Sequence, residues 1–292
     1  MFPEAPLMDP NLKKVGAIVE KWVKEKKETQ SGLLTVSLGL QEREMISLVG
    51  AGGKTTLMFC LAKELVLQGK KVITTTTTKI LEPSSEETSR LVVDSDEKRV
   101  RRLVALHLDR DRHLTIARER LGSGKLRGVS PEVVANLWDS TGADTVIVEA
   151  DGAAGRPVKV PREHEPVIPS NTTLVIALLG LDGIGQQLND ENAFQPELIS
   201  RMTGVRVGEK MTGPLLAILM THRQGIFRGA PEGARVVSFL NKIDLPGGLE
   251  NGRELAREIL NRKHPQIERV VLGQLKRDPP VAEIFLASEK RG

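Results

Sequence analysis

Short apolar and β-branched runs recur along the chain, and most end in glycines, carboxylates or other polar residues. Residues 45–49 form the first such run and lead into glycines. Residues 57–67 then have the length and pattern of a helix, and 71–75 are again rich in Val, Ile and Thr. Short β-branched runs of this kind are typical of buried strands. The order strand, glycine loop, helix, strand predicts a βαβ unit.

Five further runs predict strands, with stretches suited to helices or loops between most of them. They are residues 91–93, 145–148, 174–179, 236–240 and 270–272. This alternation predicts an α/β fold with a mainly parallel sheet and helices on both faces. Ligands bind at the carboxyl ends of parallel strands, so the residues just after each run are the candidates for a site.

The N-terminal residues have a different pattern. Residues 11–27 carry an apolar stripe at helical spacing among lysines and glutamates, which predicts an amphipathic helix. We therefore divide the chain into an N-terminal helical extension, residues 1–31, and one α/β domain, residues 32–292. The stripe either packs on that domain or docks a partner.

Composition narrows the function. The chain has 292 residues, 39% of them hydrophobic, and a single cysteine, Cys60, which excludes an internal disulfide and a multi-thiolate metal site. Aromatic residues make up 3%, with no tyrosine, and the net charge of +4 is spread along the chain. Stacking on nucleic acid is therefore not expected. No run has the roughly 20 apolar residues that a membrane span needs, and no secretory signal is present, so a cytoplasmic protein is expected.

The glycine loop after the first strand predicts a phosphate site. It consists of Gly50, Ala51, Gly52, Gly53, Lys54, Thr55 and Thr56. Glycines let backbone N–H groups approach phosphate oxygens, and the helix N-terminus favours an anion. Lys54 supplies a mobile positive charge, and the hydroxyl of Thr55 suits a nucleotide-bound Mg²⁺. Leu48 stands five residues before Gly53, so the loop is shorter than the usual P-loop pattern.

Two carboxylates follow the strand predicted at 145–148. Because strand side chains alternate, Glu149 and Asp151 are expected to point to one side. One would hold Mg²⁺ and the other would order water or sense the γ-phosphate, and the sequence leaves open which does which. We predict Lys54, Glu149 and Asp151 as catalytic residues.

A run of threonines, residues 74–78, follows the second strand and is expected at the same edge of the sheet. Strand propensity alone explains its first two members. We predict that Thr77 joins Thr55 and Asp151 at the metal.

A base-recognition motif follows the run 236–240. Asn241, Lys242 and Asp244 match the pattern N-K-x-D. A carboxylate there accepts from two N–H groups of guanine that adenine does not offer, while the lysine stem lies along the base. The order of the motifs is that of GTPases, so GTP is favoured over ATP.

These motifs together resemble the YqeC family, accessory proteins of selenium-dependent molybdenum hydroxylases. The resemblance covers residues 32–286 and rests on 48–56, 74–79, 148–152, 164–169 and 241–244. It implies a relative of the GTPases that insert metals or cofactors, with a molybdenum hydroxylase or its maturation factors as protein partner. A homodimer is also compatible with this role.

The leading interpretation is a Mg²⁺-dependent GTPase that acts in maturation. A small-molecule kinase and a non-hydrolysing nucleotide sensor or scaffold are the alternatives. Arg156 is the one arginine near a motif, and nothing in the sequence fixes it on the γ-phosphate, so slow hydrolysis without a partner is expected. Residues 155–159, with His164 and Glu165 beyond them, are a candidate second switch.

Overall fold

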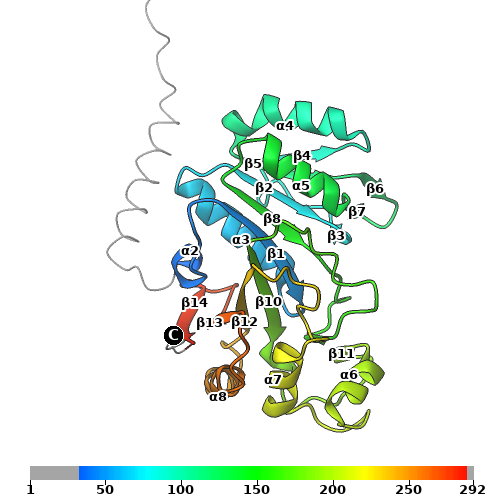
Figure 1. The fold of residues 1–292 in the computed structure, drawn as a ribbon, viewed down its shortest axis with the longest axis vertical. Helices are drawn as coiled ribbons and strands as arrows, with labels where there is room; N and C mark the ends of the chain where they lie inside the picture. The colour runs from blue at the N-terminus through cyan, green and yellow to red at the C-terminus, as the bar shows by residue number, and fades with distance from the viewer. Residues whose placement is uncertain (1–32, 288–292) are drawn as a thin grey trace, which may run out of the picture.

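A nine-stranded sheet forms the centre of the computed structural model, which describes residues 33–287 (Figure 1). The strand order is β14-β13-β12-β10-β1-β8-β2-β5-β4. Strands β13 to β4 pair in parallel throughout, and edge strand β14 runs antiparallel to β13. The strands are β1 (Glu44–Gly50), β2 (Val72–Thr76), β4 (Arg90–Val93), β5 (His113–Ala117), β8 (Thr145–Glu149), β10 (Leu174–Gly180), β12 (Arg235–Asn241), β13 (Ile267–Gly273) and β14 (Val281–Leu286).

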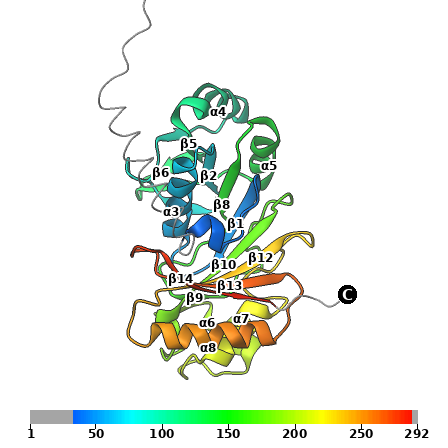
Figure 2. The same cartoon turned by 90° about the vertical axis from the view of Figure 1, so that its left-hand side faces the viewer.

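Helices cover both faces of this sheet (Figures 1 and 2). They are α2 (Leu34–Ser37), α3 (Lys54–Leu67), α4 (Glu97–Asp111), α5 (Pro131–Ser140), α6 (Pro196–Thr203), α7 (Gly213–Thr221) and α8 (Gly248–Asn261). Alternate residues of β1 show the two faces: Ile46 and Leu48 belong to the core under α2 and α3, whereas Met45 and Val49 belong to the cores under the other helices. The predicted α/β fold with a mainly parallel sheet and helices on both faces is confirmed.

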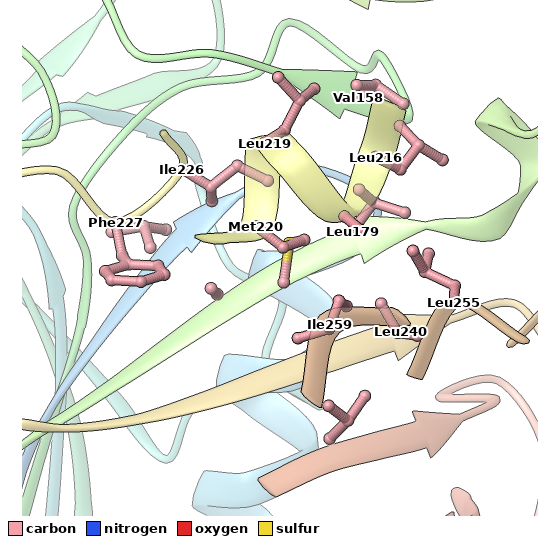
Figure 3. Close-up of a cluster of buried hydrophobic side chains, with 14 of the residues drawn as sticks. Val158, Leu179, Leu216, Leu219, Met220, Ile226, Phe227, Leu240, Leu255 and Ile259 are labelled. Carbon is pink, nitrogen blue, oxygen red and sulfur yellow. The ribbon is translucent and has the colours of Figure 1, made fainter. Parts of the chain in front are cut away.

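One core holds the strand ends that matter for the site. It packs α7 and α8 against β10 and β12, with Leu179, Leu240, Leu216 and Leu255 among its buried side chains (Figure 3). Leu179 and Leu240 directly precede the loops that leave β10 and β12. Since each fully buried leucine stabilises the fold by about 1.5–3 kcal/mol, these loop origins are firmly anchored.

All seven predicted strands are present, as β1, β2, β4, β8, β10, β12 and β13. Two small sheets add to the main one: β3 (Lys79–Leu81) pairs with β7 (Lys125–Arg127), which pairs with β6 (Glu119–Leu121), while β9 (Val158–Lys159) pairs with β11 (Ala193–Phe194). The predicted N-terminal helix lies outside the described residues. In the described part of the chain, no helix combines the length and apolarity needed to cross a membrane.

Candidate functional site

The predicted motifs meet at one edge of the sheet. Strands β8, β1, β10 and β12 are consecutive neighbours and run in parallel, so their carboxyl ends lie side by side. The glycine loop leaves β1, the two carboxylates follow β8, and the N-K-x-D motif follows β12. Loops at such an edge are the usual ligand site of a parallel sheet.

The glycines of the loop are required by close contacts with β10. Gly50 has φ 93°, and a Cβ on it would lie 2.2 Å from the carbonyl oxygen of Leu178. Gly52 has φ 84°, and its Cβ would lie 2.3 Å from the backbone nitrogen of Gly180. A side chain at either position would push the loop off the sheet. The loop therefore sits where its backbone N–H groups are held in place.

Helix α3 begins at Lys54 with its N-terminal donors uncapped. Its N-cap residue, Gly53, offers no side-chain acceptor. The first N–H groups of a helix have no partner within the helix, and Thr55 and Thr56 are only half-buried here. Ala51 differs, because its N–H donates to Leu178 of β10 at 3.0 Å. The helix start and the glycines thus form the part of the loop suited to phosphate.

Lys54 lies over this loop and is 5% exposed. Its Nζ donates to the carbonyl of Gly50 at 2.5 Å and lies 3.1 Å from Asp151 Oδ1 and 4.0 Å from Glu149 Oε1. Burial lowers the pKa of Lys54, but the two carboxylates outweigh it and hold this pKa above its usual value. The ammonium is therefore charged at neutral pH.

Glu149 accepts a hydrogen bond from the Thr55 hydroxyl at 2.7 Å. A hydroxyl that donates its hydrogen to a carboxylate keeps its lone pairs for a cation. Burial raises the pKa of Glu149, while Lys54 and then Thr55 oppose that rise. The residues described contain no group of three or more His, Cys, Asp or Glu suited to a metal. Mg²⁺ in nucleotide sites takes one or two side chains besides phosphate and water, so Thr55 and Glu149 fit it.

Asp151 is fully buried and lies between two lysines. Its Oδ2 accepts from the N–H of Gly50 at 3.1 Å and lies 3.0 Å from Nζ of Lys159, while its Oδ1 faces Lys54. The two carboxylates thus differ, because Glu149 accepts from the Thr55 hydroxyl whereas Asp151 lies within 3.1 Å of two ammonium groups. The metal role expected for Asp151 stays a prediction.

The threonine run surrounds the backbone of Glu149. Thr76 Oγ1 and Thr77 N both donate to the carbonyl of Glu149, at 2.7 and 3.2 Å. The Thr77 hydroxyl donates to the carbonyl of Val167 at 2.8 Å. This run therefore positions Glu149, and a metal contact through Thr77 stays a prediction.

Asn241 joins the base motif to the phosphate loop. Its side-chain amide donates to the carbonyl of Gly52 at 2.8 Å and accepts from the N–H of Leu275 at 3.2 Å. Gly53 has φ 134°, and a Cβ there would lie 2.5 Å from the Asn241 amide nitrogen. Asn241 therefore ties the base motif to the phosphate loop and to the loop after β13.

The charged members of the base motif form half-exposed ion pairs. Lys242 donates to Asp182, which follows β10, and Asp244 lies 3.5 Å from Nε of Arg277, which follows β13. The Lys242 and Asp182 side chains are 37% and 32% exposed. The motif thus lies beside the phosphate loop, with its carboxylate near the surface.

Lys159 ends the segment 155–159 that the sequence marked as a candidate second switch, but its burial at this site was not predicted, and Arg277 was missed. Lys159 stands between Val158 and Val160 in a β-branched run, and a charge in such a run is a signal of a buried lysine. Arg277 follows a strand but belongs to no motif, so nothing in the sequence marked it as a site residue.

Arg156, the arginine that the sequence places near a motif, donates to the backbone carbonyls of Asp190 and Ala154, at 2.6 and 3.3 Å.

The known proteins similar to this chain point to one family. The family model described as YqeC protein matches residues 46–197. The protein YqeC of Escherichia coli (strain K12) is 32% identical over 254 residues, which are 87% of this chain and 96% of that protein.

Two solved structures resemble the chain more weakly. They are the signal recognition particle 54 kDa protein of Aeropyrum pernix K1 in complex with GDP and the receptor FtsY of Elizabethkingia anophelis, each 17% identical with a TM-score of 0.37. The aligned parts cover 97% and 85% of this chain but 52% and 62% of those proteins. Likeness this low carries no conclusion about function.

Proposed function

This chain belongs to the YqeC family, and on that premise we propose that it binds and hydrolyses a nucleoside triphosphate, GTP in preference to ATP. The observation that carries the proposal is the joining of three motifs by direct contacts. Lys54 of the glycine loop reaches the carboxylates after β8, and Asn241 of the base motif reaches Gly52 of the same loop. A single ligand with phosphates at one end and a base at the other suits this arrangement.

The phosphates would lie on the loop and the start of α3. Lys54 would follow the β- and γ-phosphates, since it is a charged group on a flexible stem beside uncapped helix donors. Thr55 and Glu149 would hold Mg²⁺, which would neutralise charge on the phosphates. Asp151 would stay beside the loop, where it meets the N–H of Gly50 and two ammonium groups.

The base would lie against the motif after β12. Asp244 would accept from the two N–H groups of guanine, which excludes adenine. Lys242, ion-paired with Asp182, would place its stem along the base plane. GTP rather than ATP therefore follows from Asp244.

Hydrolysis by the protein alone would be slow. Arg156 donates to two backbone carbonyls, those of Ala154 and Asp190. Among the described residues, no contact directs it to Lys54 or Thr55. An arginine supplied by a partner raises such rates by about 10³ to 10⁵-fold. A partner protein would therefore control the rate. The family resemblance suggests a molybdenum hydroxylase, or a factor that matures it, as that partner.

Binding and hydrolysis can be measured separately. Calorimetry with GTP and ATP tests the base preference, and phosphate release with and without candidate metabolites distinguishes a GTPase from a small-molecule kinase. Free phosphate from GTP alone supports the proposal. Phosphate transfer to a metabolite would support the kinase, and tight binding without turnover would indicate a sensor.

A further inference from the structure

Lys159 is a buried ammonium that the proposed reaction does not use. It lies on β9 and has no exposed surface. Its Nζ lies 3.0 Å from both Asp151 Oδ2 and Glu165 Oε2, and it donates to the carbonyl of Gly152 at 2.6 Å. A fully buried ammonium is tolerated only where opposite charges compensate it, and here the carboxylates of Asp151 and Glu165 do so.

The position of Lys159 is fixed from several sides. Strand β9 pairs with β11, and the aromatic ring of Phe194 on β11 lies 5.0 Å from Nζ of Lys159. The segment that carries Glu165 is held by Arg228, which donates to the carbonyls of Arg162 and Glu165 at 2.7 and 2.8 Å. Lys159 therefore stays on Asp151. Lys54 stands at the start of α3, where Gly53 and Thr55 on either side of it are only half-buried.

Asp151 consequently has two cationic partners, Lys54 and Lys159, and only Lys54 is also needed at the phosphates. Lys54 lies 3.1 Å from Asp151, and the phosphates in the proposed complex attract the same ammonium. If Asp151 had Lys54 alone, that move would leave a fully buried carboxylate without a cation, which is strongly unfavourable. With Lys159 in place, Asp151 keeps a partner when Lys54 turns away.

We propose that Lys159 is a positioning residue that holds Asp151 and so frees Lys54 for the nucleotide phosphates. The inference rests on the proposed nucleotide site and deepens it. It makes Lys159 a determinant of phosphate affinity, although it would not touch the phosphates itself.

The test compares variants that change one charge at a time. Removing Lys159 alone would also leave the Glu165 carboxylate without its cation, so all variants are made in an E165Q background. In that background we expect K159M to weaken GDP binding by tenfold or more, a coupling of ordinary size for linked sites. Adding D151N to this double variant should restore the GDP affinity to within about threefold of that of E165Q. The Asp151 carboxylate that attracts Lys54 is then neutral, so Lys54 is free to meet the phosphates. Calorimetry measures each affinity, and K71M, which breaks an exposed ion pair with Asp109, is the matched control.

Guanosine separates this effect from damage to the fold. It lacks phosphates, so its affinity, measured by competition in the same variants, should not change. Equal losses of affinity for GDP and guanosine would overturn the proposal. So would an unchanged GDP affinity after K159M, or a GDP affinity that D151N does not restore. If the unmodified chain binds no nucleotide at all, the proposed function fails instead.

Discussion

The two ends of the candidate nucleotide site are built differently. At the phosphate end, Lys54, Asp151 and Lys159 are each at most 5% exposed, and Asp151 contacts both lysines directly. At the base end, Asp244 and Arg277 form a pair whose side chains are 29% and 68% exposed. Both ends use opposite charges, but only the first removes those charges from water.

This difference sets how strongly each end responds to change. A buried ion pair that loses one member leaves a charge without solvent or partner, which typically costs about 3–5 kcal/mol. An exposed pair is screened by water, and its loss has a small effect. The phosphate end should therefore dominate affinity, and the base end should mainly select among nucleotides.

The largest effect is expected from Lys54→Ala. It removes the cation that would follow the phosphates and leaves Asp151 with Lys159 alone. We expect GTP affinity to fall by about 10²-fold or more, as for other truncated buried charge pairs. Calorimetry on Lys71→Ala, which changes a partly exposed lysine just before β2, provides the comparison. Equal affinity in both variants would mean that the glycine loop is only a turn.

Glu149→Gln should separate the metal from the phosphates. The amide keeps a hydrogen bond with Thr55 but loses the charge that suits Mg²⁺. We expect the gain in GTP affinity on adding Mg²⁺, relative to EDTA, to shrink by about tenfold, while affinity in EDTA changes little. A gain that survives in Glu149→Gln but disappears in Asp151→Asn would move the metal role to Asp151.

Asp244→Asn should change selection rather than affinity for phosphates. An amide donates where the carboxylate only accepts, so xanthine nucleotides should improve against GTP by about tenfold in relative affinity. Competition calorimetry with xanthosine and guanosine triphosphates measures the ratio. A fall in affinity for both nucleotides alike would show that Asp244 supports the fold instead of reading the base.

The smallest effect is expected from Arg277→Ala. The guanidinium is 68% exposed and its contact with Asp244 is 3.5 Å, so water replaces it easily. We expect GTP affinity to change by less than about threefold. A change as large as that of Lys54→Ala would erase the distinction between the two ends.

The sequence predicted where the motifs of the candidate site lie, because each motif directly follows a strand with a strong local signal. Residues 45–49 and 236–240 are apolar except for Ser47 and Ser238, and the two runs are confirmed as strands β1 and β12. Strand β5 was missed because His113 and Thr115 interrupt its apolar residues, although Thr74 satisfies them by hydrogen bonds across the sheet. Such pairing between strands is not visible in one segment of sequence.

The charge network could not be predicted in the same way. Which of Glu149 and Asp151 meets the Thr55 hydroxyl depends on side-chain geometry between the end of β8 and the start of α3. The contact between Asp151 and Lys159 further requires β9 to fold back beside the loop. These are tertiary relations, and neither spacing nor residue type determines them.

The central claim is that one nucleotide occupies both ends at once. Calorimetry of the purified chain with GTP, guanosine and ATP in the presence of Mg²⁺ tests it most directly. We expect GTP to bind far more tightly than guanosine, because the buried phosphate end contributes most of the affinity, and more tightly than ATP because of Asp244. Equal binding of GTP and ATP would refute the base assignment, and no binding of either would contradict the whole account.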